Sequence, residues 1–161
     1  MKRERSANPP RTPKSSVRHL RAASPRVLSK ILADHLKALN QRDLDRLMTF
    51  YADDAVLVFP ASPPVEGKAN IRRAYASFFE NWEETSTYGV VIMSGATAAA
   101  EGTVTGRHRT LHLRIPGRIP APSRAYRHNF AMFVEMEGGK IRRQRVYFDA
   151  RDLVKQILGD V

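Results

Sequence analysis

The sequence predicts an α+β fold in which a curved antiparallel sheet wraps around N-terminal helices. Through residue 84 the apolar residues recur mainly at helical spacing, interrupted by one short apolar run that is typical of a buried strand. Beyond residue 84 the chain is a series of strand-like runs broken by turn residues, followed by a last short helix. The 161 residues are enough for one domain with a modest extension.

The first helix is expected to start at Ser24, a good N-cap residue, with Pro25 at the first helical position. Asn40 is expected to end this helix. Its broad apolar face is made of Leu28, Ile31, Leu32, His35, Leu36 and Leu39. A short second helix over residues 44–51 should follow, and then an acidic turn over residues 52–54.

The apolar run Ala55–Phe59 is expected to be a strand that is buried on most sides. Gly67 should precede a third helix that ends near Glu84 and supplies the aromatic residues Tyr75, Phe78, Phe79 and Trp82. A proline-rich loop is expected over residues 115–122, and Asp149 should cap a final helix. The strands expected after the third helix are Thr85–Met93, Thr97–His108, Ala125–Met136 and Lys140–Phe148.

The positive charge is concentrated at the start of the chain. The net charge is +11, but residues 1–30 carry nine Lys and Arg residues against one Glu, which leaves +3 for the rest. We expect Met1–Ala23 to be a disordered basic tail, separate from a domain over residues 24–161. Three interpretations of the tail stay open: a solvated extension, a weak contact with nucleic acid, and a transit peptide.

The chain has no cysteine, which excludes disulfides, thiolate metal sites and a cysteine nucleophile. No apolar run reaches the roughly 18 residues that a membrane span needs. The tail also lacks the apolar segment of a secretory signal peptide. We therefore expect a cytoplasmic protein with no membrane contact.

Several short stretches between residues 27 and 159 occur in a characteristic order and spacing. They are Ala38-Leu39-Asn40, Asp43-Leu44-Asp45, Tyr51-Ala52-Asp53-Asp54-Ala55, Gly67, Gly106, Gly117–Pro122, Gly139-Lys140-Ile141 and Tyr147-Phe148-Asp149. Together they resemble the SnoaL-like domains of the nuclear-transport-factor-like superfamily. The resemblance implies a cone-shaped fold that encloses one apolar pocket, often within a homodimer, and such a pocket is the default ligand site on physical grounds.

The resemblance also implies catalytic positions, but different residues stand there. Ketosteroid isomerases use a base at the end of the first strand, a tyrosine in the first helix and a protonated acid in the long strand. These positions fall on Phe59, His35 and Met132, so we expect no ketosteroid isomerase activity. The key acid of SnoaL-like aldol cyclases also falls on Met132, and the second Asp of limonene epoxide hydrolases falls on Val146.

Strand alternation extends the expected pocket. If Met132 faces inward, His128 and Phe130 share its face of the strand, and the same argument points Gln144 and Phe148 inward on the last strand. The expected ligand-binding residues are therefore Phe59, Trp82, Phe130, Met132, Gln144 and Phe148.

His128 is the leading catalytic candidate and His35 the second, because imidazole can act as acid or base near neutral pH. A buried structural histidine is the alternative for both residues. His108 and His112 have the same strand parity as each other, but no carboxylate pattern supports a zinc site with His128. We expect no metal and no cofactor.

Two functions stay open at this point. The first is an isomerase-, cyclase- or lyase-type enzyme that acts on a hydrophobic, carbonyl-bearing substrate by acid–base chemistry at His128. The second is a non-catalytic module that binds an apolar ligand or serves in dimeric interactions. Either function implies a small apolar ligand and a homodimer, and nucleic acid is expected only as a weak contact of the tail.

Overall fold

The computed structural model describes residues 24–109 and 124–158. The expected basic tail, Met1–Ala23, and the expected proline-rich loop over residues 115–122 lie outside the described residues.

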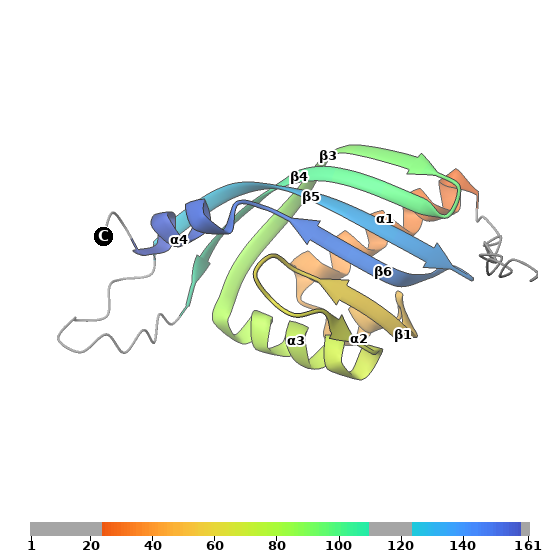
Figure 1. Cartoon of the computed structure of the whole chain (residues 1–161), viewed down its shortest axis with the longest axis horizontal. Coiled ribbons are helices and arrows are strands. Elements are labelled where there is room, and N and C mark those ends of the chain that lie inside the picture. The colour runs from red at the N-terminus through yellow and green to blue at the C-terminus, as the bar shows by residue number, and fades with distance from the viewer. Residues whose placement is uncertain (1–23, 110–123, 159–161) are drawn as a thin grey trace, which may run out of the picture.

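Among the described residues, one curved six-stranded sheet forms the body of the fold, in the strand order β2-β1-β6-β5-β4-β3 (Figure 1). All neighbouring strands are antiparallel except β1 and β6, which run parallel. The strands are β1 (Tyr51–Val58), β2 (Val65–Glu66), β3 (Trp82–Ser94), β4 (Thr97–His108), β5 (Ala125–Glu137) and β6 (Lys140–Tyr147). The predicted α+β class with a curved sheet is confirmed.

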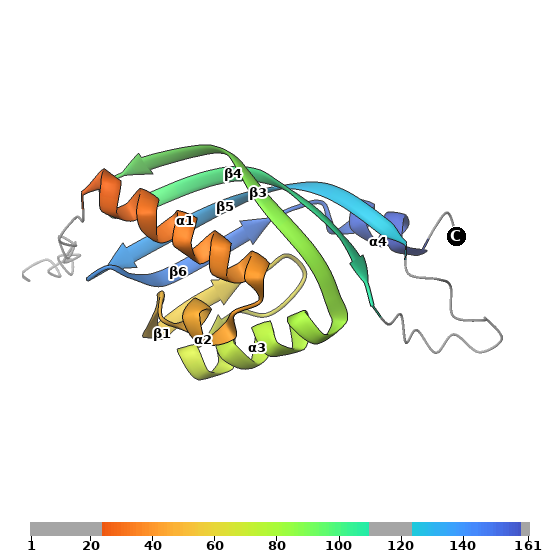
Figure 2. The same ribbon diagram turned by 180° about the vertical axis from the view of Figure 1, so that it is seen from behind.

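In the part of the chain that the structure describes, four helices accompany the sheet: α1 (Pro25–Gln41), α2 (Leu44–Met48), α3 (Lys68–Asn81) and α4 (Ala150–Leu158). Figure 2 shows α1 lying across the sheet, with α3 beneath it and α4 at the far end. The apolar faces of α1 and α3 are buried against the sheet through residues such as Leu28, Leu32, Ile71 and Tyr75. The space between these helices and the sheet is where a pocket can form.

Two polar side chains, Asn40 and Arg42, tie the end of α1 to the sheet and to α3, and a third, Asp149, caps α4. The side-chain amide of Asn40, in the last turn of α1, donates to the carbonyl of Ser86 at 2.9 Å and accepts from its N–H at 2.9 Å. Arg42 follows with a left-handed conformation (φ 58°) and donates to the carbonyls of Phe79 and Trp82 at the junction of α3 and β3. Asp149 caps α4 as expected, accepting from the N–H groups of the helix's first turn.

The start of β3 differs from the expectation. The strand begins at Trp82, three residues before the predicted Thr85, because Trp82, Glu83 and Glu84 pair with the end of β4. Asn81 is the last residue of α3, so helix passes directly into strand with no turn residue between them.

The start of β1 also differs. Tyr51 was expected at the end of a helix over residues 44–51, but it begins the strand, and α2 covers only Leu44–Met48. Tyr51 pairs with Ile141 of β6 and is fully buried. The expected acidic turn is therefore part of the strand, where Asp53 and Asp54 face solvent and form ion pairs.

Candidate functional site

A cavity of about 480 Å³ lies between the concave face of the sheet and the helices. Its wall is mostly apolar and aromatic, which suits a small hydrophobic molecule. The eight residues singled out in the sequence all line it: His35, Phe59, Trp82, His128, Phe130, Met132, Gln144 and Phe148. Their placement agrees with the alternation argument, and their roles in binding and catalysis stay predictions.

Alternation along β5 explains this placement. Tyr126, His128, Phe130 and Met132 are buried, while the residues between them are exposed. The inward residues therefore stand in a row along the cavity wall.

Two glycines of β4 make room for side chains from both neighbouring strands. A Cβ atom at Gly102 would lie 2.8 Å from ring atoms of Phe130. A Cβ atom at Gly106 would lie 2.8 Å from Cγ of Glu84 and 2.9 Å from the hydroxyl of Tyr126. Side chains of β3 and β5 can therefore meet across β4 only because these two positions have no side chain.

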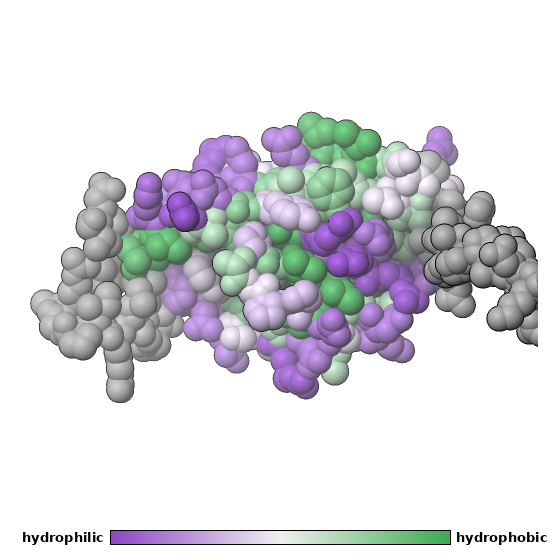
Figure 3. All heavy atoms as spheres, in the orientation of Figure 1, coloured by the Kyte–Doolittle hydropathy of each residue, from purple (hydrophilic) through white to green (hydrophobic). Residues whose placement is uncertain are grey.

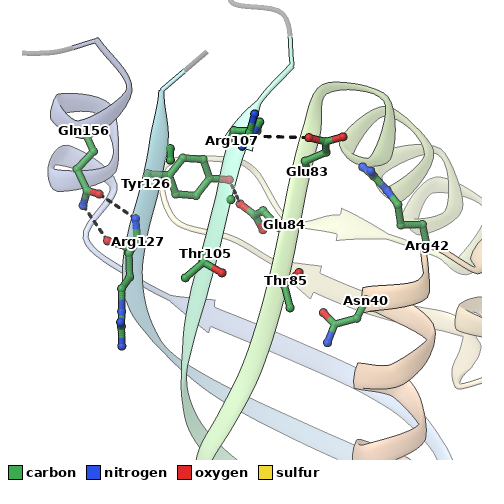
Figure 4. Close-up of a pocket in the computed structure, with 12 residues that line it drawn as sticks. Asn40, Arg42, Glu83, Glu84, Thr85, Thr105, Arg107, Tyr126, Arg127 and Gln156 are labelled. Atoms are coloured by element: carbon green, nitrogen blue, oxygen red, sulfur yellow. Dashed lines mark hydrogen bonds and ion pairs between the residues drawn. The ribbon is translucent and has the colours of Figure 1, made fainter. Parts of the chain in front are cut away.

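Glu84 is the main residue that the sequence analysis missed. It lines the cavity, and the hydroxyl of Tyr126 donates a short hydrogen bond to its Oε1 across Gly106 (Figure 4). Burial raises the pKa of Glu84, although the bond from Tyr126 and the nearby His128 act in the opposite direction. Burial and the adjacent Glu84 also raise the pKa of Tyr126, so this phenol keeps its proton.

A second, more open hollow of about 800 Å³ adjoins this contact on the other side. Glu84 belongs to the walls of both spaces, and Tyr126, Arg107 and Arg127 stand around the hollow (Figure 4). The Glu84–Tyr126 bond therefore lies where the inner cavity meets the surface.

His128 is 8% exposed and lies beside this pair. Its ring stacks on Tyr126 with centroids 6.0 Å apart and packs on Phe148 at 4.8 Å. Nδ1 lies 3.2 Å from the carbonyl oxygen of Asn129, which can only accept a hydrogen bond, so Nδ1 carries the proton. In the neutral ring Nε2 is then the basic nitrogen.

The other end of the cavity holds a buried hydrogen-bonded network. The hydroxyl of Tyr51 lies 3.0 Å from Nε2 of His35, 2.9 Å from the hydroxyl of Tyr75 and 2.6 Å from Oε1 of Gln144. Nε2 of Gln144 lies 3.2 Å from the sulfur of Met132. The sequence analysis placed His35, Met132 and Gln144 here but not the two tyrosines that join them.

Burial decides the protonation of this network. It lowers the pKa of His35 to about 4 and raises the pKa of Tyr75 to about 12. It also raises the pKa of Tyr51 well above the usual value, with a further rise from the neighbouring Tyr75. At neutral pH the network therefore contains a neutral imidazole and two protonated phenols.

Within residues 24–109 and 124–158, no group of three or more His, Cys, Asp or Glu residues is arranged to hold a metal ion. His112 of the histidine set considered above lies outside these residues. None of the helices in this part of the chain is both long and apolar enough to cross a membrane.

Residues 32–144 match the family model of the SnoaL-like domain. The chain belongs to the SnoaL-like family. Its cone-shaped sheet and helices place it in the nuclear-transport-factor-like superfamily, as the resemblance implied. No curated protein matches the sequence.

Solved structures share the fold of this SnoaL-like protein. A candidate polyketide cyclase from Xanthomonas campestris pv. campestris is 20% identical with a TM-score of 0.76, over 83% of this chain and 98% of that one. An LEH-like epoxide hydrolase from M. tuberculosis is 19% identical with a TM-score of 0.66, over 83% and 90%. A protein with a ketosteroid isomerase-like fold from Catenulispora acidiphila, in complex with trimethylamine, is 17% identical with a TM-score of 0.68, over 80% and 92%. At these identities the likeness shows the fold alone.

The low pKa of His35 predicts a specific loss of stability in acid. The unfolded chain binds a proton at His35 near pH 6.5, whereas the folded SnoaL-like domain does so only near pH 4, so stability falls as the pH drops between these values. The contribution is on the order of 3 kcal/mol across this window. We expect His35→Gln, which keeps a donor for Tyr51, to flatten the pH dependence of the unfolding free energy measured in urea.

The unfolding free energy of the wild type must be compared with that of His35→Gln at each pH, because Glu84 also makes stability depend on pH. Its raised pKa gives a contribution of opposite sign, lost as the pH rises above the usual range of a glutamate, and the substitution leaves that contribution in place. Parallel curves for the wild type and His35→Gln between pH 4 and 6.5 would contradict a neutral, buried His35.

Proposed function

We propose that this SnoaL-like protein is an acid–base enzyme that acts on a small, hydrophobic, carbonyl-bearing molecule. One observation carries the proposal: His128 and Glu84 stand together on the wall of a mostly apolar cavity, and Tyr126 behind them stacks on His128 and donates to Glu84. A base of this kind, with a carboxyl group beside it and little water, suits the removal of a proton from carbon.

The proposed step begins with the proton on the carbon next to the carbonyl. Nε2 of His128 accepts this proton while Nδ1 stays bonded to the carbonyl of Asn129, and the electrons of the C–H bond move into the enolate. The imidazolium that forms is positive, and a Glu84 carboxylate, which is near enough to interact with that charge, stabilises it. Return of the proton to another carbon gives isomerisation. Attack of the enolate on a second carbonyl of the substrate gives cyclisation, and the alkoxide that forms takes the proton back from the imidazolium.

The base proposed here differs from those of the superfamily enzymes considered above. Phe59 and Met132 line the cavity but have no group that can exchange a proton, so the steroid isomerase arrangement is not proposed. Glu84 supplies a carboxyl group from a different strand, next to a histidine.

Deuterium exchange into 2-tetralone tests the proposal. This bicyclic ketone has acidic C–H bonds beside its carbonyl, and in D₂O the enzyme should accelerate their exchange, as followed by mass spectrometry. We expect His128→Gln to lower the exchange rate by a factor of about 10² to 10⁴, because the general base is lost. Arg127→Gln, on the exposed face of the same strand, is the control and should exchange like the wild type.

Binding is measured in parallel, because the single tryptophan of the chain, Trp82, lines the cavity and reports an occupant by its fluorescence. Wild-type exchange rates in His128→Gln would show that His128 is structural. A fluorescence response without any exchange in the wild type would replace the enzyme by the alternative function, a protein that binds an apolar ligand without turnover.

We also propose that the protein is a homodimer formed through the outer face of the sheet. Four large apolar residues on this face are between 41% and 64% exposed: Val90, Ile92, Phe133 and Tyr147. Exposed apolar residues that lie together in this way are typical of an interaction surface, unlike apolar residues scattered singly. They lie in two adjacent cross-strand rows, Ile92–Ala99–Phe133–Arg145 and Val90–Glu101–Ala131–Tyr147. Figure 3 shows apolar side chains (green) on this side of the molecule.

The charges of the two rows favour a second copy as the occupant. Arg145 ends one row and Glu101 lies within the other. A twofold axis through the patch can therefore bring Arg145 of each copy against Glu101 of the other copy. We expect light scattering to give a dimer for the wild type and a monomer for Ile92→Lys, with Thr85→Lys, outward on the same strand, staying dimeric. A monomeric wild type, or a dimeric Ile92→Lys, would contradict this interface.

A further inference from the structure

The hydrogen bonds of the buried network have a fixed direction. The hydroxyl of Tyr51 lies 2.6 Å from Oε1 of Gln144, an amide oxygen that carries no proton, so Tyr51 is the donor. A tyrosine has one proton, and this bond uses it. The other two contacts of the Tyr51 oxygen must then be accepted bonds.

Those two bonds come from Tyr75 and His35. The hydroxyl of Tyr75 donates to the Tyr51 oxygen at 2.9 Å, and Nε2–H of His35 donates at 3.0 Å. Because the buried imidazole is neutral, its second nitrogen, Nδ1, has a lone pair and no proton. This Nδ1 is buried and has no hydrogen-bond partner in the described structure, although His35 itself is 1% exposed.

Met132 determines the orientation of the Gln144 amide, and with it the whole network. Its sulfur can only accept, so the amide nitrogen lies against it at 3.2 Å and the amide oxygen turns to Tyr51. The opposite orientation would place an amide oxygen against a sulfur, two acceptors with no proton between them. Met132 stands where related enzymes carry an acid. Because of this methionine, the protons of the network are directed at other members of the network and not at the cavity.

We propose that this end of the cavity selects ligands that carry a hydroxyl or amino group, through the acceptor lone pairs that Tyr75 and His35 keep. Both residues line the cavity, and the protons on Tyr75 Oη and on Nε2 of His35 are engaged with Tyr51. The amide protons of Gln144 are engaged as well, because its side chain also bonds to Tyr75, where it lowers the pKa of the phenol, and its amide nitrogen lies against Met132. A ligand hydroxyl or amino group can donate to one of the acceptor lone pairs, whereas an ether or ketone oxygen can only accept and finds no free proton in the network.

The position of this subsite deepens the proposed function, on which the inference rests for taking the cavity as the ligand site. His128 and Met132 are four residues apart on β5, about 13 Å along the strand. The reacting carbonyl would lie near His128 and the donor group near Gln144, beyond Met132. The substrate class is therefore an apolar carbonyl compound with a hydroxyl or amino group at its opposite end.

Three probes of nearly the same shape test the subsite: 2-naphthol, 2-methoxynaphthalene and naphthalene, measured by calorimetry at pH 7. We expect 2-naphthol to bind about tenfold or more tightly than 2-methoxynaphthalene, because only the phenol can donate to the unpaired acceptors. Naphthalene should bind no more tightly than the ether.

Two tyrosines, one in the cavity and one on the outer face of the sheet, give a matched pair of variants. Tyr75→Phe removes an acceptor of the network and should bring the ratio of the two affinities close to one. Tyr147→Phe removes a hydroxyl on the outer face of the sheet, where Tyr147 is 48% exposed, and should keep the wild-type ratio. Met132→Leu, which conserves volume, frees the amide to turn, and the ether should then gain affinity.

Equal binding of 2-naphthol and 2-methoxynaphthalene to the wild type would overturn the inference, as would no binding of any probe. Loss of the preference in Tyr147→Phe but not in Tyr75→Phe would overturn it as well. The measurement involves no turnover, so it fails independently of the proposed catalysis. Selective binding of 2-naphthol without deuterium exchange into 2-tetralone would reject the enzyme and keep the subsite.

Discussion

The cavity depends on the small size of the inward-facing side chains of β4. These are Ala98, Ala100, Gly102, Val104 and Gly106, whereas the facing row on β5 is made of large side chains. Side chains from β3 and β5 can approach each other over β4, because a Cβ atom at Gly102 would lie 2.8 Å from the Phe130 ring and one at Gly106 would lie 2.8 Å from Cγ of Glu84. The same absence of side chains leaves space above β4 that the helices do not fill.

The two glycines also account for how the polar groups are arranged. Gly106 lets Tyr126 reach Glu84, and His128 stacks on that tyrosine, so one wall of the cavity has a carboxyl group and an imidazole that are both held by the same phenol. The second polar cluster lies toward the other end, around Tyr51, and Phe130 and Met132 lie between them on β5. A ligand that fits the cavity thus meets polar groups at both ends and apolar surface along its length.

The sequence was sufficient for the fold class and for the side chains placed by strict strand alternation. His128, Phe130 and Met132 follow from β5, a long regular strand whose register has no interruption before Glu135. Glu84 could not be found in this way, because apolar residues keep helical spacing up to Trp82 and no turn residue marks the passage from α3 to β3. The pairing of Trp82 and its neighbours with β4, a long-range contact, decides that passage.

Tyr51 was misplaced for a similar reason. It lies at helical spacing from Leu47 and Met48, and a register shift between Tyr51 and Val56 interrupts the alternation that would have assigned it to β1. Its parallel pairing with β6 involves residues about ninety positions away, which no local pattern contains. The sequence therefore predicted His35, Met132 and Gln144 as separate pocket residues and not the hydrogen-bond network that joins them through Tyr51.

A crystal structure of the protein with 2-tetralone is the most direct test of the central claim, that the interior cavity is a site of proton transfer at His128. The account predicts the ketone inside the cavity, with a carbon next to the carbonyl roughly 3 to 3.5 Å from Nε2 of His128, the separation expected of reacting atoms. A ketone bound in the outer hollow between Arg107 and Arg127, or one whose carbonyl end points to Gln144 and away from His128, would contradict it.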